Sequence, residues 1–238
     1  MSGIPEHVLA AFQVEAGAPV AAGSAWDNGL RYGRIVVSRA AGYAAWSAKL
    51  RDRLSVEGVR VARPARAIDG RFVVGGYKAS EFAEGVVASR ADEVIAAALA
   101  FEEAVAGESL PSAERTDAWA EADRAAWRGA EGEVPARGGV AHLDFFHTCI
   151  FSGTLPPLLT DVVPSAEPRP AGYTAALALV DALLARAVDD RILARWAHIP
   201  DLTELALRAL EYRVILDRRE DSNMSSEIEH VRALLVSG

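Results

Sequence analysis

One short segment holds the side chains whose spacing could support chemistry. Asp144 and Asp161 lie 17 positions apart, and each stands beside a short apolar run. The residues between them predict two short strands, from Cys149 to Ser152 and from Leu158 to Asp161, joined by a Gly-Thr-Leu-Pro-Pro turn. Such a hairpin would bring both carboxylates to one end. A carboxylate pair suits phosphoryl transfer, because one can orient the acceptor hydroxyl while the other holds a metal ion on the phosphates.

At these residues the chain resembles the aminoglycoside phosphotransferase family, which is related to the protein kinases. The catalytic loop of that family runs His-Gly-Asp, then a metal-binding Asn five residues after the Asp, then a second, metal-binding Asp. His142 and Asp144 match the His and the first Asp, and Asp161 matches the second Asp. Leu143 replaces the Gly, and Cys149 stands where the Asn is expected. The chain also looks like actinobacterial members with a degenerate catalytic loop, over most of its length.

The resemblance implies an α+β fold with two lobes. Residues 1–85 would form a small antiparallel sheet with one helix, and residues 86–238 a mainly helical lobe that carries the hairpin. It also implies an ATP- and magnesium-dependent phosphotransferase, of weak activity, acting on a hydroxyl of a small molecule. Asp144 would then be the catalytic base, His142 the brace of the catalytic loop, and Asp161 the magnesium ligand. The alternative is a catalytically inactive relative, a pseudokinase, that binds a nucleotide or a protein partner.

Candidate nucleotide-binding residues lie in the first 85 positions. A turn-rich segment, residues 23–29, separates two predicted strands and could present backbone N–H groups to phosphates, and Ser24 is its candidate side chain. Kinases place a phosphate-binding lysine on the third strand, but here that position falls on Ser38 or Arg39. Arg39 is one candidate for the phosphate role, because a guanidinium also binds phosphate, and Lys49 is the other. An ordinary hairpin and a surface lysine are the alternative interpretations.

The predicted elements follow the order of a kinase-like N-terminal lobe and then become helical. Strands are expected at residues 18–22, 30–32, 34–39, 59–64 and 70–75, with helices at 5–12 and 40–54. Residues 77–85 are expected to form a hinge. Helices are then expected at residues 89–105, 112–128, 173–188, 190–198, 202–216 and 225–236. Because these helices are apolar and joined by short loops, we expect them to pack as a bundle.

Composition and charge limit the class of protein. The 238 residues are 51% hydrophobic, which excludes general disorder and allows a sizeable core. The longest apolar run, residues 94–101, is far shorter than the roughly 20 residues that span a bilayer. We therefore expect a cytoplasmic protein with no membrane partner, and its single cysteine excludes an internal disulfide. Residues 1–85 carry a net charge of +3 and residues 86–238 one of −11, which favours a cationic small-molecule substrate over nucleic acid. The alternative interpretation is that the negative net charge of residues 86–238 comes from ordinary solvated helix faces and has no role in binding.

Other chemistries have weaker support in the sequence. His142, His147 and Cys149 form one cluster, but its spacing does not match a structural zinc site, which needs four ligands. Cys149 could pair with either histidine as a nucleophile, although its apolar neighbours favour a small buried residue. The chain has no Gly-x-Ser-x-Gly elbow, no Walker loop and no Rossmann glycine motif.

Overall fold

The computed structural model describes residues 3–15, 17–112, 114–129, 138–220 and 224–237. Contacts divide the chain into two units, of which unit 1 comprises Met1–Val87 and His147–Val162. Unit 2 comprises Ala88–Phe146 and Val163–Gly238. The short helix α5 (Phe145–Thr148) crosses the boundary between them. The expected hairpin thus groups with the N-terminal residues, and a lobe boundary at residues 85 and 86 stays a prediction.

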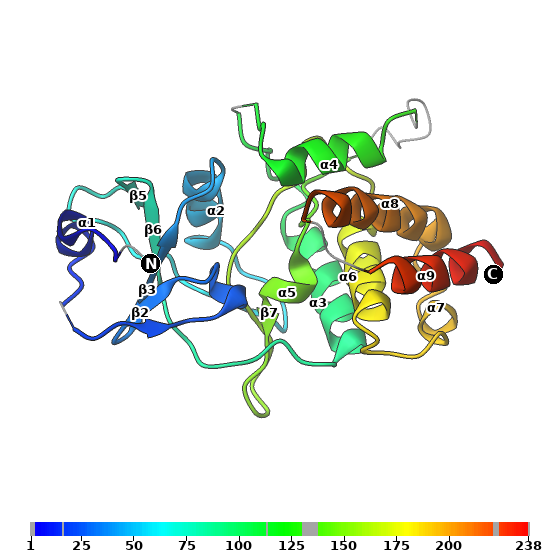
Figure 1. Ribbon diagram of the computed structural model, residues 1–238, viewed down its shortest axis with the longest axis horizontal. Coiled ribbons are helices and arrows are strands. Elements are labelled where there is room, and N and C mark those ends of the chain that lie inside the picture. Colours follow the sequence, from blue (N-terminus) through cyan, green and yellow to red (C-terminus); the bar gives the residue numbers. More distant parts are fainter. Residues whose placement is uncertain (1–2, 16, 113, 130–137, 221–223, 238) are drawn as a thin grey trace. The chain divides into compact units, whose positions relative to one another are not determined.

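Unit 1 is built around an antiparallel sheet of five strands in the order β1-β2-β3-β6-β5 (Figure 1). A second sheet of three strands has the order β4-β8-β7, with β4 parallel to β8 and β7 antiparallel to it. The α+β prediction and the predicted β7–β8 hairpin are therefore confirmed. The elements are α1 (Glu6–Ala11), β1 (Val20–Ala21), η1 (Ser24–Trp26), β2 (Leu30–Tyr32), β3 (Ile35–Arg39), α2 (Ala44–Arg51), β4 (Arg60–Val61), β5 (Val73–Val74), β6 (Tyr77–Glu81), β7 (Cys149–Ile150) and β8 (Leu158–Leu159).

Strand β6 corrects the expected hinge. Residues 77–81 form a strand that pairs with β3 on one side and β5 on the other. The cause is the pair Gly75 and Gly76, whose φ angles of 58° and 77° suit the two central positions of a tight hairpin turn. The turn reverses the chain directly into β6. This segment is therefore a central strand of the sheet and is buried from Tyr77 to Ser80.

Strand β4 corrects part of a second expectation. Residues 59–64 are expected to join the N-terminal sheet, and Pro64 does bridge Ser80 of β6, but β4 itself pairs with β8 of the hairpin. The backbone N–H of Arg60 donates to the Pro157 carbonyl at 2.8 Å, and that of Ala62 to the Leu159 carbonyl at 2.9 Å. A parallel pair of this kind joins segments far apart in the sequence, so local patterns carry no signal for it.

The two faces of the five-stranded sheet pack against different partners. Val37 of β3 belongs to an apolar cluster with Val8 and Phe12 of the α1 region. Its neighbour Val36 belongs to a cluster with Trp26 and Leu158 on the opposite face. This alternation follows from the two-residue period of a strand, and it places every second side chain of β3 and β6 on the hairpin side.

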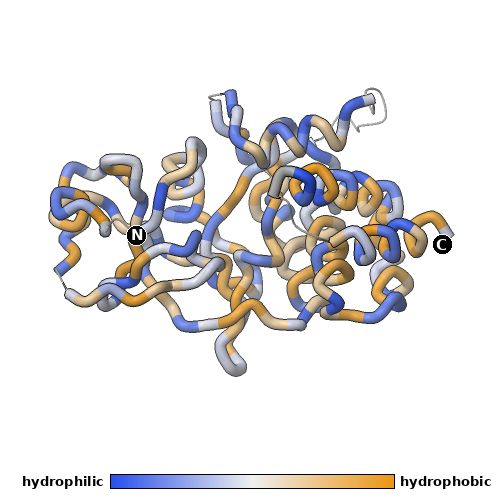
Figure 2. Tube along the Cα trace, in the orientation of Figure 1, coloured by the Kyte–Doolittle hydropathy of each residue, from blue (hydrophilic) through white to orange (hydrophobic). Residues whose placement is uncertain are grey.

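Unit 2 is a helical bundle around α6, whose twelve residues are all buried. Helix α6 packs against α3, α8 and α9, and α4 packs against α8 (Figure 1). Figure 2 shows hydrophobic residues concentrated among these helices. The predicted bundle is confirmed. Its helices are α3 (Ala91–Ala104), α4 (Ala118–Ala126), α6 (Tyr173–Leu184), α7 (Ile192–Arg195), α8 (Leu202–Glu220) and α9 (Ser225–Ser237).

Helix α4 begins later than the sequence predicts. Its N-cap is Asp117, whose carboxylate accepts the Ala120 N–H at 3.1 Å, so the expected start at residue 112 is wrong. Helix α8 runs to Glu220, beyond the predicted end at residue 216. Residues 130–137, which follow α4 in the chain, lie outside the described residues. Across the described ranges, no helix is both long enough and apolar enough to cross a membrane.

Candidate active site

Asp161 lies at the centre of a buried polar cluster in unit 1. It follows β8, and its side chain is 5% exposed. One carboxylate oxygen accepts the Ser47 hydroxyl at 2.5 Å and lies 3.3 Å from the Arg51 Nε. The other oxygen forms an ion pair with the Lys78 ammonium group. Because Ser47 and Arg51 are four residues apart on α2, one face of that helix presents both to the carboxylate.

Lys78 is the second centre of the same cluster. Besides Asp161, its Nζ contacts the carboxylate of Asp27 at 2.7 Å. Asp27 stands in the turn between β1 and β2, directly after η1, in the left-handed backbone conformation with φ of 52°. The lysine thus connects the predicted metal residue to the predicted nucleotide-covering turn. A lysine in such a position can bind phosphate as a point charge.

The register of the sheet explains why Lys78 is there. In the β3–β6 pair, Lys78 stands directly opposite Ser38. Ser38 is one of the two positions where the family resemblance places the phosphate-binding lysine. Residues directly opposite in an antiparallel pair project from the same face of the sheet. The ammonium group of Lys78 therefore comes from β6, the neighbouring strand, on the same face of the sheet. The sequence did not mark Lys78 as a site residue, and the one signal that could have found it is that the chain has just two lysines.

The other three predicted nucleotide residues lie elsewhere in unit 1. Arg39 is exposed, and its guanidinium stacks 4.5 Å from the centre of the Tyr77 ring. Lys49 is exposed on α2, and Ser24 is exposed in η1. Within the described ranges, none of the three makes an ion pair or hydrogen bond with Asp161. Their assignment to a nucleotide stays a prediction.

The charges around Asp161 already balance. Burial alone would raise the pKa of the Asp161 carboxyl, but the charges of Lys78 and Arg51 outweigh it and hold that pKa well below its ordinary value. The carboxylates of Asp27 and Asp161 offset the two cations. Mg²⁺ prefers several oxygen ligands in octahedral geometry and net negative charge. In this arrangement the residues around Asp161 do not fit a magnesium site.

Cys149 adds to this misfit. It stands at the family's asparagine position and is fully buried in β7. A neutral thiol is a soft, weak ligand for a hard cation, so it does not replace an amide oxygen.

Unit 2 holds the other predicted catalytic residues. His142 is fully buried, and its Nδ1 accepts the backbone N–H of Asp144 at 3.0 Å. Its own backbone N–H donates to the Thr174 hydroxyl at 3.1 Å, and its ring packs edge-on against Phe101 and Phe145. The histidine therefore orients the backbone of the residue that carries the candidate base. The bracing role itself stays a prediction.

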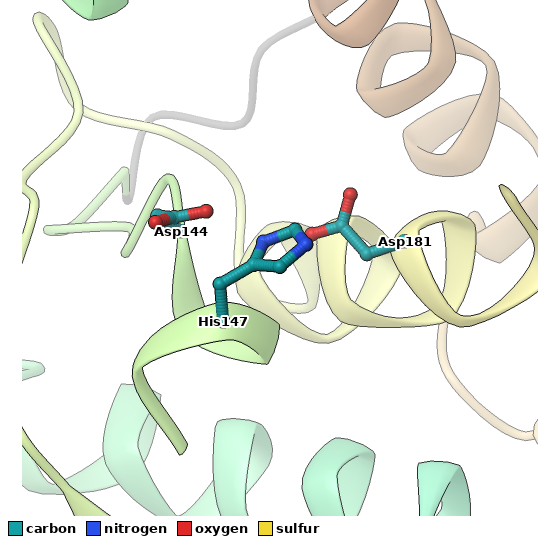
Figure 3. Close-up of side chains that lie close together, drawn as sticks. All are labelled: Asp144, His147 and Asp181. Carbon is teal, nitrogen blue, oxygen red and sulfur yellow. The ribbon is translucent and has the colours of Figure 1, made fainter. Parts of the chain in front are cut away.

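Asp144 shares a cation with a second carboxylate. Arg213 of α8 forms a two-point ion pair with Asp181 of α6, with its Nε 2.5 Å from Asp181 Oδ1. The same guanidinium lies 3.4 Å from Asp144 Oδ1 and donates to the Leu143 carbonyl at 3.1 Å. Figure 3 shows the carboxylates of Asp144 and Asp181 turned toward one another, and an oxygen of each lies within 4.8 Å of the other. It also draws His147 of α5. Neither Arg213 nor Asp181 had a sequence motif that marked it.

The strand order of unit 1 and the α6-centred bundle of unit 2 define a kinase-like phosphotransferase fold. Over its whole length the chain matches an aminoglycoside phosphotransferase from Alicyclobacillus acidocaldarius, covering 96% of it, with a TM-score of 0.58 and 15% identity. It also matches a thermostable mutant of aminoglycoside phosphotransferase APH(4)-Ia, in ternary complex with AMP-PNP and hygromycin B. That match covers 87% of each chain, with a TM-score of 0.49 and 12% identity. No protein-family model and no curated protein matches the sequence, so similarity to actinobacterial members stays a prediction. The chain has the fold of an aminoglycoside phosphotransferase.

Proposed function

We propose that the protein is a weak, nucleotide-dependent phosphotransferase whose phosphate-binding lysine is Lys78. The supporting observation is the contact of Lys78 with both Asp161 and Asp27. Catalysis of phosphoryl transfer is mostly positioning and charge stabilisation, and a lysine on the phosphates is one of its recurring parts. The acceptor would be a hydroxyl of a small, cationic molecule, in keeping with the acidic C-terminal part of the chain. Bound ATP would supply the transferred phosphoryl group.

Unit 2 would supply the acceptor chemistry. Asp144 is 16% exposed at its side chain, so it is accessible to a ligand in a way that Asp161 is not. Its carboxylate would orient the acceptor hydroxyl and take its proton. Arg213 would hold the catalytic loop in place through Asp144 and the Leu143 carbonyl.

A second candidate is a catalytically inactive protein that binds a nucleotide or a protein partner. The observation that favours it is the pairing of Asp161 with two cations, which leaves no net negative charge for a metal ion. The phosphotransferase and a nucleotide-binding inactive relative both require nucleotide binding through Lys78, and they differ in turnover. An inactive relative that binds a protein partner does not require ATP binding.

Lys78→Met tests the proposal. The substitution keeps an unbranched chain of similar length and removes the charge, so ATP affinity should fall by at least about tenfold, or 1.4 kcal/mol. Isothermal titration of the full chain with ATP would measure it. Lys49→Met is the matched control, because Lys49 is exposed on α2, and its affinity should stay within about twofold of the native value.

Release of ADP measures turnover in the same proteins. Slow release by the native protein that is lost in Lys78→Met would support the phosphotransferase. Tight ATP binding with no detectable release under any acceptor tried would favour the inactive relative. Equal losses in Lys78→Met and Lys49→Met would contradict the assignment of Lys78 to the phosphates. No ATP binding by the native protein would contradict the phosphotransferase and leave only an inactive relative that binds a protein partner.

A further inference from the structure

Unit 2 contains a cavity of about 540 Å³ that the proposed reaction does not use. None of its lining residues belongs to the catalytic loop at residues 142–149. Its volume lies within the roughly 300–1,000 Å³ typical of small-molecule sites. Much of the lining is apolar, from Leu99, Trp127, Ile199 and Leu205. A ligand with an apolar body would therefore find both the room and the surface to bury it.

The acidic side chains of the cavity have no lysine or arginine beside them in its lining. Glu102, Glu103, Asp201 and Glu204 line it with His198, and neither a lysine nor an arginine is among the lining residues. Glu103, Asp201 and Glu204 are exposed. Carboxylates around a concave apolar wall focus a negative potential into it. The cavity should therefore attract cations and repel anions.

Glu102 differs from the other three because it is half-buried and its carboxylate is held in place. Its two oxygens accept the backbone N–H groups of Gly172 at 2.7 Å and Thr174 at 2.6 Å, at the start of α6. The Thr174 hydroxyl also bonds to this carboxylate, and together these bonds fix its orientation. Burial raises the pKa of Glu102, although both backbone N–H groups act in the opposite direction.

The enclosed carboxylates elsewhere in the described chain have a cationic partner. Asp123 pairs with Arg169 at 2.9 Å, Asp161 with Lys78, and Asp181 with an arginine of α8. Glu102 makes no ion pair with a lysine or arginine in the described ranges. The positive end of α6 compensates it only in part, since a helix terminus carries roughly half a unit charge. Glu102 is half-buried on the wall of an apolar cavity and has no lysine or arginine partner in the described ranges, so a cation from outside the chain could bind to it.

We propose that this cavity binds a small organic cation, an ammonium group carried on an apolar body. The ammonium would donate to the carboxylate of Glu102, and the apolar body would contact Leu99, Ile199 and Leu205. The exposed carboxylates at the cavity would add long-range attraction. The site is separate from the proposed phosphotransferase site and does not depend on it.

Three indole compounds that differ mainly in charge provide the test. Tryptamine is a cation at neutral pH, tryptophol is neutral, and indole-3-acetate is an anion. In isothermal titrations with the full chain at low salt, tryptamine should bind at least about tenfold more tightly than tryptophol, with indole-3-acetate the weakest. Equal affinities for tryptamine and tryptophol, or no binding of tryptamine at millimolar concentration, would overturn the proposal.

Variants then locate the site. Glu102→Gln keeps the shape of the side chain and removes its charge, so the preference for tryptamine over tryptophol should fall to the small part that the exposed carboxylates supply. Glu229→Gln is the matched control, because Glu229 is exposed on α9 and does not line the cavity. Unchanged tryptamine binding by folded Glu102→Gln would contradict the assignment.

A second variant keeps the test decisive if Glu102→Gln does not fold. Ala106 is exposed and lines the cavity, so Ala106→Phe would occupy its volume without changing the carboxylate. It should weaken binding of tryptamine and tryptophol alike, by about tenfold or more, and native affinity in this variant would overturn the proposal. Asp144→Asn should bind tryptamine as the native protein does. A loss there would place the amine at the catalytic loop instead.

Discussion

Two aspartates that the sequence presents as one pair differ in their surroundings. Asp161 is enclosed by Lys78, Arg51 and the Ser47 hydroxyl, so its negative charge is compensated by ion pairs within unit 1. Asp144 is more exposed and shares a single arginine with Asp181. At the residue scale, the proposed function therefore assigns the acceptor substrate to Asp144 and the positioning of Lys78 to Asp161.

Asp144→Asn should separate binding from turnover. The substitution removes the proton acceptor, and general-base catalysis contributes typically about 10²–10⁴-fold to a rate. Turnover should fall by about this factor, while ATP affinity stays within about twofold of the native value, because Asp144 does not contact Lys78, Asp27 or Asp161 in the ion pairs of that cluster. Steady-state rates and ATP titrations on the same preparation give both numbers. A parallel loss of ATP affinity would show that Asp144 supports the nucleotide site.

Magnesium should have little effect on nucleotide binding by the native protein. Because two cations already balance Asp161, adding magnesium should change ATP affinity by less than about threefold. Cys149→Asn adds a carbonyl oxygen and should increase the magnesium effect, while Cys149→Ser, of similar volume, serves as its control. ATP titrations with and without magnesium provide the comparison. A strong magnesium dependence in the native protein would contradict this account of the Asp161 cluster.

At the scale of elements, the cluster depends on how closely β3 and the turn before β2 approach one another. A Cβ placed on Gly29 would lie 2.8 Å from the Val37 carbonyl oxygen and 2.9 Å from the Ser38 Cβ. No larger residue fits there without moving the strand. Gly29 therefore sets the distance between the turn that carries Asp27 and strand β3. Strand β3 is the neighbour of β6, which carries Lys78.

Gly29→Ala should destabilise unit 1. The clash is with backbone and strand atoms, so relief requires a backbone shift costing typically about 1–3 kcal/mol. Gly42→Ala is the matched control, since a Cβ on Gly42 meets nothing within 4 Å. Chemical denaturation monitored by circular dichroism would compare the two variants. Equal stability of Gly29→Ala and Gly42→Ala would show that the strand yields to the added methyl group.

At the scale of the whole molecule, the buried ion pairs make the free energy of unfolding depend on pH in the acidic range. The pKa of Asp161 is below its ordinary value of 3.8 in the folded protein. A lowered pKa means that this carboxylate stabilises the fold above about pH 3.8 and that the contribution is lost as the pH falls toward the folded-state pKa. The free energy of unfolding should therefore drop below that pH.

Asp161→Asn should remove this contribution. At neutral pH it leaves Arg51 without its carboxylate, and breaking a buried pair costs roughly 3–5 kcal/mol. As the pH falls below 3.8, the native protein loses the same stabilisation, so the difference between the two should narrow. Asp52→Asn, which breaks an exposed pair with Arg66, is the control and should cost less than about 1 kcal/mol. Urea unfolding at several pH values would show a constant difference if this explanation were wrong.

The sequence by itself determined the features that depend on neighbouring residues. Apolar spacing predicted the helices of unit 2, and the turn residues between Ile150 and Leu158 predicted the hairpin that the structure contains. The motif around His142 and Asp144 pointed to the kinase-like fold that the structural comparison shows. These signals are local, because helix periodicity and turn chemistry act over a few residues.

Only the tertiary structure decided which lysine reaches the predicted metal residue. Lys78 stands opposite Ser38 because β6 pairs with β3, and it meets Asp161 because the hairpin packs on the same face. The enclosure of Asp161 by α2 is also a contact between distant segments. Such contacts depend on strand register and packing, which join residues 40 to 114 positions apart and leave no pattern in the sequence around any one of them.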